Sequence, residues 1–258
     1  CINIRKDIIQ ISHQSGHGHI PTSFSIIECL CALYNQMKHD PLKPDRDDRD
    51  IFILSKGHAA LGLYATLASY GYFSIDDVFR FGGFDQKFGC HPDRLKVPGI
   101  EASTGSLGHG ISLAVGIALA IKIKRGARRV FTLIGDGESN EGTVWESIMI
   151  AEHNKLDNLT IIFDYNNSQS RCLPVTNAAA RFSAFGCNVI EVDGHNILEL
   201  EEAIRSPQST VKVIVAKTIK GYGCASFTNG DGVFAWHRRS PTAAECGVLL
   251  GELNAFAS

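Results

Sequence analysis

Five short runs of apolar residues, separated by segments with helical patterns, constrain the fold of this chain most strongly. Polar and apolar residues do not alternate within them, which is typical of strands buried on both faces of a sheet. Strands that alternate with helices predict a parallel sheet with helices on both faces, and we expect one α/β domain over residues 1–258. The predicted strands are Ile51–Leu54, Val130–Ile134, Leu159–Asp164, Val189–Val192 and Val211–Lys217.

The segments around these runs carry apolar residues at helical spacing. The predicted helices are Ile2–Gln14, Ser23–Met37, Ala59–Tyr70, Gly110–Lys124, Thr143–Asn154 and Ile197–Arg205. The stretch from Gly221 to Pro241 is rich in glycine and irregular, and a helical pattern begins at Thr242. So long an irregular stretch usually serves a site or an interface.

Composition excludes several classes of function. The net charge is −2, from 25 basic and 27 acidic residues, so the chain does not indicate a nucleic-acid or anionic-membrane partner. Its longest apolar run, Ile111 to Ile121, is far shorter than the ~20 residues of a membrane span. The 8 cysteines include no Cys-x-x-Cys pair, and a chain of this length needs no cross-links. We therefore expect reduced thiols and a cytoplasmic protein.

The predicted strand at Val130–Ile134 runs directly into Gly135-Asp136-Gly137. Ligands of parallel sheets bind beyond the carboxyl ends of the strands, so Asp136 stands where a ligand is expected. The flanking glycines allow backbone N–H groups to approach an anion, while the carboxylate can hold a metal ion. The alternative is a tight turn in which Asp136 and Asn140 only cap the next helix.

A second polar residue follows the neighbouring strand. Asn166 comes thirty residues after Asp136, the length of one βαβ unit of ~30 residues. Two adjacent strand ends would thus present a carboxylate and an amide oxygen to one point. A small set of hard oxygen ligands suits Mg²⁺ that is shared with a diphosphate.

Gly135-Asp136-Gly137, the acid Glu141 and Asn166 together resemble the thiamine diphosphate binding motif. The surrounding residues, from Gly16 to Pro241, are similar to transketolases, in particular to the N-terminal subunit of split two-chain transketolases. This resemblance implies a transferase that moves a two-carbon ketol unit between sugars or sugar phosphates. It also implies thiamine diphosphate as the cofactor, with Mg²⁺ or with Ca²⁺ or Mn²⁺ in its place.

The resemblance also assigns roles to residues near the two strand ends. Asp136 and Asn166 are expected to ligate the metal by side chain and Ser168 by its carbonyl. Gly137 is expected to offer its N–H to the diphosphate. Glu141 matches an acid that reaches across the subunit interface towards the partner's active-site glutamate. The family usually carries a large aliphatic residue at the position of Ser168, so one apolar contact with the cofactor is lost here.

Four histidines stand in contexts similar to those of transketolases. A single histidine in a loop is more often an exposed or hydrogen-bonded imidazole than a catalyst. Imidazoles can nevertheless stabilise a developing oxyanion and move protons between sugar hydroxyls. The resemblance implies catalytic roles for His19, His58, His91 and His237, and cofactor contacts for His58 and His237.

Three further assignments follow from the resemblance. His19 aligns with the family histidine better than His17 does. Gly105 and Leu107 are expected to contact the cofactor rings, in front of a helix that also forms the subunit interface. His195, in Asp193-Gly194-His195, is expected to have a structural role.

The family's cofactor-activating glutamate and its substrate-phosphate arginines lie on a separate pyrimidine-binding domain, for which we expect no room in 258 residues. We therefore expect activity only with a partner subunit that carries this C-terminal domain, in an α₂β₂ assembly. A 1-deoxyxylulose-5-phosphate synthase-like or unusual-sugar enzyme is the first alternative. A catalytically silent, cofactor-binding regulatory homologue is the second.

Overall fold

The computed structural model describes residues 1–257 and contains one sheet of five parallel strands in the order β1-β2-β3-β5-β4. Each predicted strand is confirmed, with ends that differ by no more than one residue. The fold class, a parallel sheet with helices on both faces, is confirmed as well. The strands are β1 (Ile51–Leu54), β2 (Val130–Gly135), β3 (Leu159–Tyr165), β4 (Asn188–Asp193) and β5 (Lys212–Lys217).

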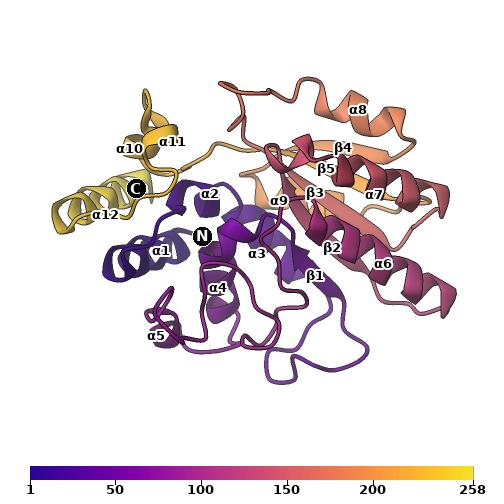
Figure 1. The fold of residues 1–258 in the computed structure, drawn as a ribbon, viewed down its shortest axis with the longest axis horizontal. Coiled ribbons are helices and arrows are strands. Elements are labelled where there is room, and N and C mark those ends of the chain that lie inside the picture. The colour runs from indigo at the N-terminus through magenta and orange to yellow at the C-terminus, as the bar shows by residue number, and fades with distance from the viewer. Residues whose placement is uncertain (258) are drawn as a thin grey trace.

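Helices cover both faces of the sheet, and successive residues of each strand contribute to opposite sides (Figure 1). In β1, Ile51 and Ile53 pack with α6 (His109–Ile123) and α7 (Gly142–His153), whereas Phe52 and Leu54 join the opposite cluster. Burial on both sides explains why the strands read as continuous apolar runs. Also on the α6 side is α8 (Ala178–Ala184), while α3 (Ile27–Gln36) and α9 (Ile197–Arg205) lie on the other.

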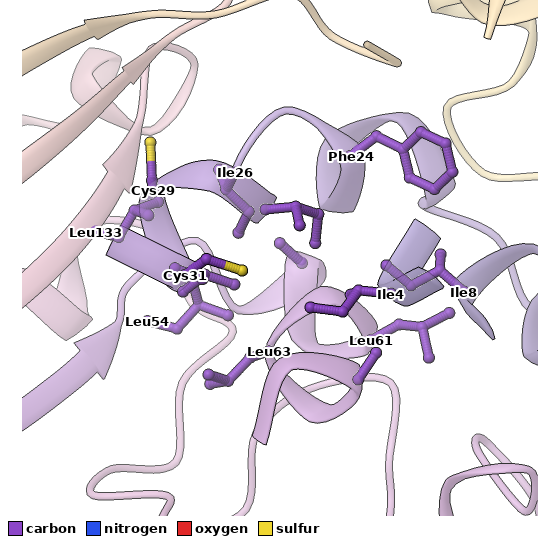
Figure 2. Packing of buried hydrophobic residues seen from close by; sticks show 14 of the residues in the cluster. Ile4, Ile8, Phe24, Ile26, Cys29, Cys31, Leu54, Leu61, Leu63 and Leu133 are labelled. Carbon is purple, nitrogen blue, oxygen red and sulfur yellow. The ribbon is translucent and has the colours of Figure 1, made fainter. Parts of the chain in front are cut away.

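A layer of helices extends the apolar cluster on the face of the sheet that carries Phe52 and Leu54. It contains α1 (Ile2–Ser15), α2 (Ile20–Phe24), α4 (Ala60–Ser69) and α12 (Ala243–Ala257), with α1 packed against both α4 and α12. Figure 2 shows Ile4, Ile8, Phe24 and Leu61 within this one apolar cluster. This layer fixes α2, which stands at the edge of the functional site.

One predicted helix is wrong in its extent. Residues 23–37 were expected to form a single helix, but α2 ends at Phe24 and α3 begins at Ile27. The backbone leaves the helical conformation at Ile26, and the hydroxyl of the preceding Ser25 donates to the Asp164 carboxylate at 2.9 Å and lies 3.1 Å from the Thr22 carbonyl oxygen. The apolar spacing of this segment continues across Ile26 and does not indicate the break.

Several short helices were not predicted, because one or two turns leave no clear periodicity. They are α5 (Ile75–Val78), α8, α10 (Ala225–Thr228) and α11 (Gly232–Ala235), besides single 3₁₀ turns at Gly57–Ala59 and Glu138–Asn140. Because α10 and α11 lie between Gly221 and Pro241, the stretch that was expected to be irregular is irregular only in part. Within residues 1–257, no helix combines the length and apolar character that a membrane crossing requires. All eight cysteines are free thiols.

Candidate functional site

A cavity of about 440 Å³ opens at the carboxyl ends of β1, β2 and β3. It brings together every predicted site residue except Glu141, from segments far apart in the sequence. The predicted residues in its lining are His19, His58, His91, Gly105, Leu107, Asp136, Gly137, Asn166, Ser168 and His237. Glu141 is exposed and precedes α7, outside this lining.

Asp136, Asn166 and Ser168 form one linked cluster. The Asp136 side chain is almost completely buried, and its Oδ1 accepts hydrogen bonds from the Gly137 N–H at 2.7 Å and the Ser168 hydroxyl at 2.6 Å. The Ser168 N–H donates to Asn166 Oδ1 at 3.0 Å. Asn167, between them, takes a left-handed conformation with φ of 57°, which turns the chain back towards Asp136.

The chemistry of this cluster fits a hard cation. Burial, reinforced by the negative charge of Asp164, raises the pKa of Asp136 although Ser168 donates to it. A bound cation would compensate the buried carboxylate. No group of three or more His, Cys, Asp or Glu side chains within residues 1–257 could hold a metal alone. A cation here would depend on amide and carbonyl oxygens and on a ligand's own oxygens, as Mg²⁺ with a diphosphate does.

Three histidines face one another across the cavity. The ring centroid of His19 lies 5.7 Å from that of His58 and 5.4 Å from that of His237. Burial is the main cause that lowers the pKa of His58 to about 2 and those of His19 and His237 to about 4. Nearby positive charges lower these pKa values further: Lys56 acts on His58, Arg238 on His19 and Lys220 on His237. All three imidazoles are therefore neutral near pH 7, and each can both donate and accept a hydrogen bond.

The structure separates His19 from His17. His19 lines the cavity in a left-handed conformation, with φ of 68°, just before α2. His17 lies outside the lining, with Nε2 at 3.1 Å from the Gly82 carbonyl oxygen. Between them, a Cβ on Gly18 would lie 2.1 Å from the Arg238 carbonyl oxygen, so only glycine fits there.

A buried ion pair behind the cluster was missed by the sequence analysis. Lys56 Nζ lies 2.5 Å from Asp164 Oδ2, and the two side chains are 1% and 0% exposed. Asp164 also accepts hydrogen bonds from Asn166 Nδ2 at 2.7 Å and from the Thr218 hydroxyl. It thus orients the Asn166 amide. In the sequence, the only sign of this ion pair is that Asp164 is an ionisable residue near the end of an apolar strand.

Glu138 was also missed, although it is buried in the cavity wall. Its carboxylate accepts from the Ser55 hydroxyl at 2.5 Å, the Gly108 N–H at 2.9 Å and the Gly135 N–H at 3.2 Å. These bonds fasten the loop that carries Gly105 and Leu107 to the end of β2. The residue stands two positions after Asp136, but no local pattern indicates its distant partners.

Lys220 and Arg238 add positive charge to the lining and were not predicted either. Lys220 Nζ lies 3.1 Å from His237 Nδ1. Burial, followed by the charge of Lys56, lowers the pKa of Lys220 to about 8. The ammonium can therefore exchange protons near neutral pH.

His195 lies outside the cavity lining and makes structural contacts. Its Nδ1 is 3.0 Å from Glu28 Oε2, its Nε2 accepts the Ile219 N–H at 2.8 Å, and its ring stacks on Tyr222. The Ile219 contact supports the segment that carries Lys220 into the cavity.

The neutral histidines predict acid sensitivity of the cofactor-free chain. Unfolded histidines bind protons as the pH falls below about 6.5, whereas His19 and His237 resist protonation until about 4 and His58 until about 2. The free energy of unfolding is therefore expected to decrease from pH 6.5 to 4, by up to about 1.4 kcal/mol per pH unit for His58 and by less for His19 and His237, which solvent screens in part. Urea unfolding at pH 7, 6, 5 and 4.5 measures this slope.

His58→Asn is expected to reduce the slope, because it removes the histidine with the most strongly lowered pKa. His153→Asn, at the exposed end of α7, is the matched control and should leave it unchanged. Equal slopes in the two variants would show that His58 does not cause the acid sensitivity.

A parallel α/β sheet that presents an acid, an amide and neutral imidazoles at its strand ends is typical of a domain that binds a phosphorylated cofactor. Residues 3–238 match the family model "Transketolase, thiamine diphosphate binding domain", and the chain belongs to this family. The predicted family is therefore confirmed.

Relatives and solved structures agree with this membership. The chain is 35% identical to one subunit of the apulose-4-phosphate transketolase of Phocaeicola vulgatus, over 97% of this chain and 91% of the relative. It is 40% identical to 6-deoxy-6-sulfo-D-fructose transketolase subunit SqwG of a Clostridium species, over 88% of this chain and 86% of the relative. Transketolase from Leishmania mexicana superposes with a TM-score of 0.88 at 26% identity, over 98% of this chain and 40% of that one. The chain thus spans about two fifths of the length of solved transketolases.

Proposed function

We propose that this chain is the cofactor-binding subunit of a two-chain transketolase that transfers a two-carbon ketol unit between sugars or sugar phosphates. Its relatives of similar length are named as subunits, and it corresponds to about two fifths of the solved transketolase chains. One observation carries the proposal. A single cavity is lined by the oxygen atoms of Asp136 and Asn166, which can ligate a metal ion, and by three neutral imidazoles.

In this proposal Asp136, Asn166 and the Ser168 carbonyl hold Mg²⁺, and the Gly137 N–H faces the diphosphate. Gly105 and Leu107 contact the cofactor rings. When bound, thiamine diphosphate supplies the nucleophilic carbon that breaks and forms bonds beside a carbonyl group. Lys56 and Asp164 keep the Asn166 amide in place, which limits the freedom of the metal ligands.

The histidines act on the sugar. Because His19, His58 and His237 are neutral, each has one ring nitrogen that donates and one that accepts a hydrogen bond. They can therefore hold and orient the hydroxyl groups of a sugar. Lys220, in contact with His237, can donate a hydrogen bond to that imidazole and so fix which of its ring nitrogens faces the sugar. His91, on the exposed loop near Gly105, closes this side of the cavity.

The proposal includes a partner subunit that carries the pyrimidine-binding domain, in an α₂β₂ assembly. Glu141 supports it, because this acid is exposed at the start of α7 and makes no ion pair within residues 1–257. A side chain in that position is free to reach a neighbouring chain.

Reconstitution tests the function. The chain is combined with a co-purifying protein that carries a pyrimidine-binding domain, thiamine diphosphate and Mg²⁺, and is offered a panel of ketose phosphates with an aldose acceptor. We expect product exchange that requires both chains and both cofactors. Cofactor-dependent stabilisation of the complex without exchange on any donor would favour a silent homologue instead.

A further inference from the structure

Lys220 enters the cavity from a segment whose backbone is held on both sides of the lysine. On one side, the Ile219 N–H donates to His195 Nε2 at 2.8 Å. On the other, the Gly221 N–H donates to the Pro21 carbonyl oxygen in α2 at 3.0 Å. An imidazole outside the cavity lining therefore helps to set where the lysine side chain starts.

The contacts of His195 fix its tautomer. Because Nε2 accepts the Ile219 N–H, the ring proton of this neutral imidazole is on Nδ1. Nδ1 lies 3.0 Å from Glu28 Oε2 and therefore donates to it. The ring also stacks on Tyr222, with 3.5 Å between the ring centroids. An imidazole that carried a proton on Nε2 would lose the bond to Ile219, because that nitrogen would then be a donor.

Glu28 holds this tautomer, and Arg5 holds Glu28. Arg5 donates to both carboxylate oxygens of Glu28, at 2.5 and 2.7 Å, and both residues are buried. Burial raises the pKa of Glu28, but the hydrogen bonds from Arg5 and His195 outweigh it and lower this pKa to about 2. Arg5 also donates to the Phe24 carbonyl oxygen at the end of α2, at 2.7 Å. The network thus joins α1, α2 and α3 to the loop after β4.

Lys220 in turn determines the tautomer of His237. An ammonium group has only donors, and Lys220 Nζ lies 3.1 Å from His237 Nδ1, so this nitrogen accepts. The ring proton of the neutral His237 is therefore on Nε2. None of the ion pairs within residues 1–257 involves Lys220, so the place of its ammonium depends on the backbone of its own segment.

We propose that His195 is a positioning residue, which fixes the place of Lys220 and, through it, the tautomer that His237 presents to the sugar. Arg5 and Glu28 act with it, because they hold the imidazole in the form that accepts the backbone N–H. This inference rests on the proposed function, which puts the sugar at the histidines. The tautomer itself can be measured in the cofactor-free chain, without any substrate.

Nitrogen-15 NMR of the chain labelled in its histidine rings tests the tautomer at pH 7, because a ring nitrogen that carries a proton resonates far from one that does not. His237→Asn assigns the signals of His237. His195→Phe keeps a ring that can stack on Tyr222 but removes the acceptor, so the two nitrogens of His237 should shift towards the average of both tautomers. Lys220→Met should cause the same shift. Unchanged His237 signals in His195→Phe would overturn the proposal.

His39→Phe is the matched control for a general loss of packing. His39 also stacks on a tyrosine, Tyr72, and its Nε2 lies 2.9 Å from the Tyr34 carbonyl oxygen, but it lies outside the cavity lining. The substitution should lower the thermal stability and leave the His237 signals as in the unmodified chain. If both phenylalanine variants moved these signals equally, His195 would have no special role.

A double-mutant comparison of activity in the reconstituted complex tests the route through Lys220. His195→Phe is expected to lower kcat by about 10-fold, since a small displacement of a positioned group is costly. In a Lys220→Met background, the same substitution should cause no further loss. Losses that multiply would show that His195 acts by another route and would overturn the proposal. If no donor is turned over, the proposed function fails, and the NMR comparison still decides the role of His195.

Discussion

Asp136→Asn is expected to abolish the stabilisation that thiamine diphosphate and Mg²⁺ together give to the complex with the partner subunit. At one hundred times its Kd, a ligand stabilises by about 2.7 kcal/mol, which in a chain of this size raises Tm by about 5–10 °C. The substitution keeps the shape of the side chain and the bonds from Gly137 and Ser168, but it removes the negative charge on which the metal depends.

The transferase activity of the complex should fall by at least about 100-fold in the same variant. Losing a residue that merely supports a metal ligand already costs about 10- to 100-fold. Differential scanning fluorimetry, with and without Mg²⁺ and the cofactor, measures the stabilisation, and the exchange assay measures the activity.

Asp193→Asn is the matched control. Asp193 ends β4 in the same sheet, is exposed, and accepts the His195 N–H at 2.9 Å, a bond that asparagine preserves. The control should keep the full thermal shift. A full shift in Asp136→Asn would contradict the assignment of Asp136 as a metal ligand.

The sheet could be predicted from sequence because its strands are buried on both faces. Such strands need apolar residues at every position, so β2 and β3 could be read with only small errors at their ends. The strand ends then placed Asp136 and Asn166 at one edge, and both line the cavity. The histidines could not be assigned to the site in this way. Their assignment came from the resemblance to transketolases, because no periodicity indicates it.

The polar network behind the cavity could not be predicted, because its partners are distant in sequence. Lys56 and Asp164 are separated by 108 positions, and Ser55 and Glu138 by 83. Their contacts depend on the strand order, which the apolar runs do not encode. The same network includes Ser25, beside the wrong helix boundary, whose hydroxyl donates to Asp164.

Lys56→Met is expected to destabilise the cofactor-free chain by about 3–5 kcal/mol, because removing one partner of a buried ion pair leaves the other charge uncompensated. Asp164 is completely buried, and the neutral donors that remain, Ser25, Asn166 and Thr218, do not replace the ammonium. At about 2–4 °C per kcal/mol, the Tm should fall by about 6–20 °C. Thermal and urea unfolding without cofactor measure the loss.

Two comparisons separate the buried charge from general packing. Adding Asp164→Asn to Lys56→Met should restore part of the stability, because the uncompensated carboxylate is gone while its shape remains. Lys122→Met breaks an ion pair with Asp157 whose side chains are 37% and 53% exposed, so it should cost no more than about 1 kcal/mol. If Lys56→Met were as mild as Lys122→Met, water would have to reach Asp164. The amide of Asn166 would then lack the rigid support that the proposed metal site requires.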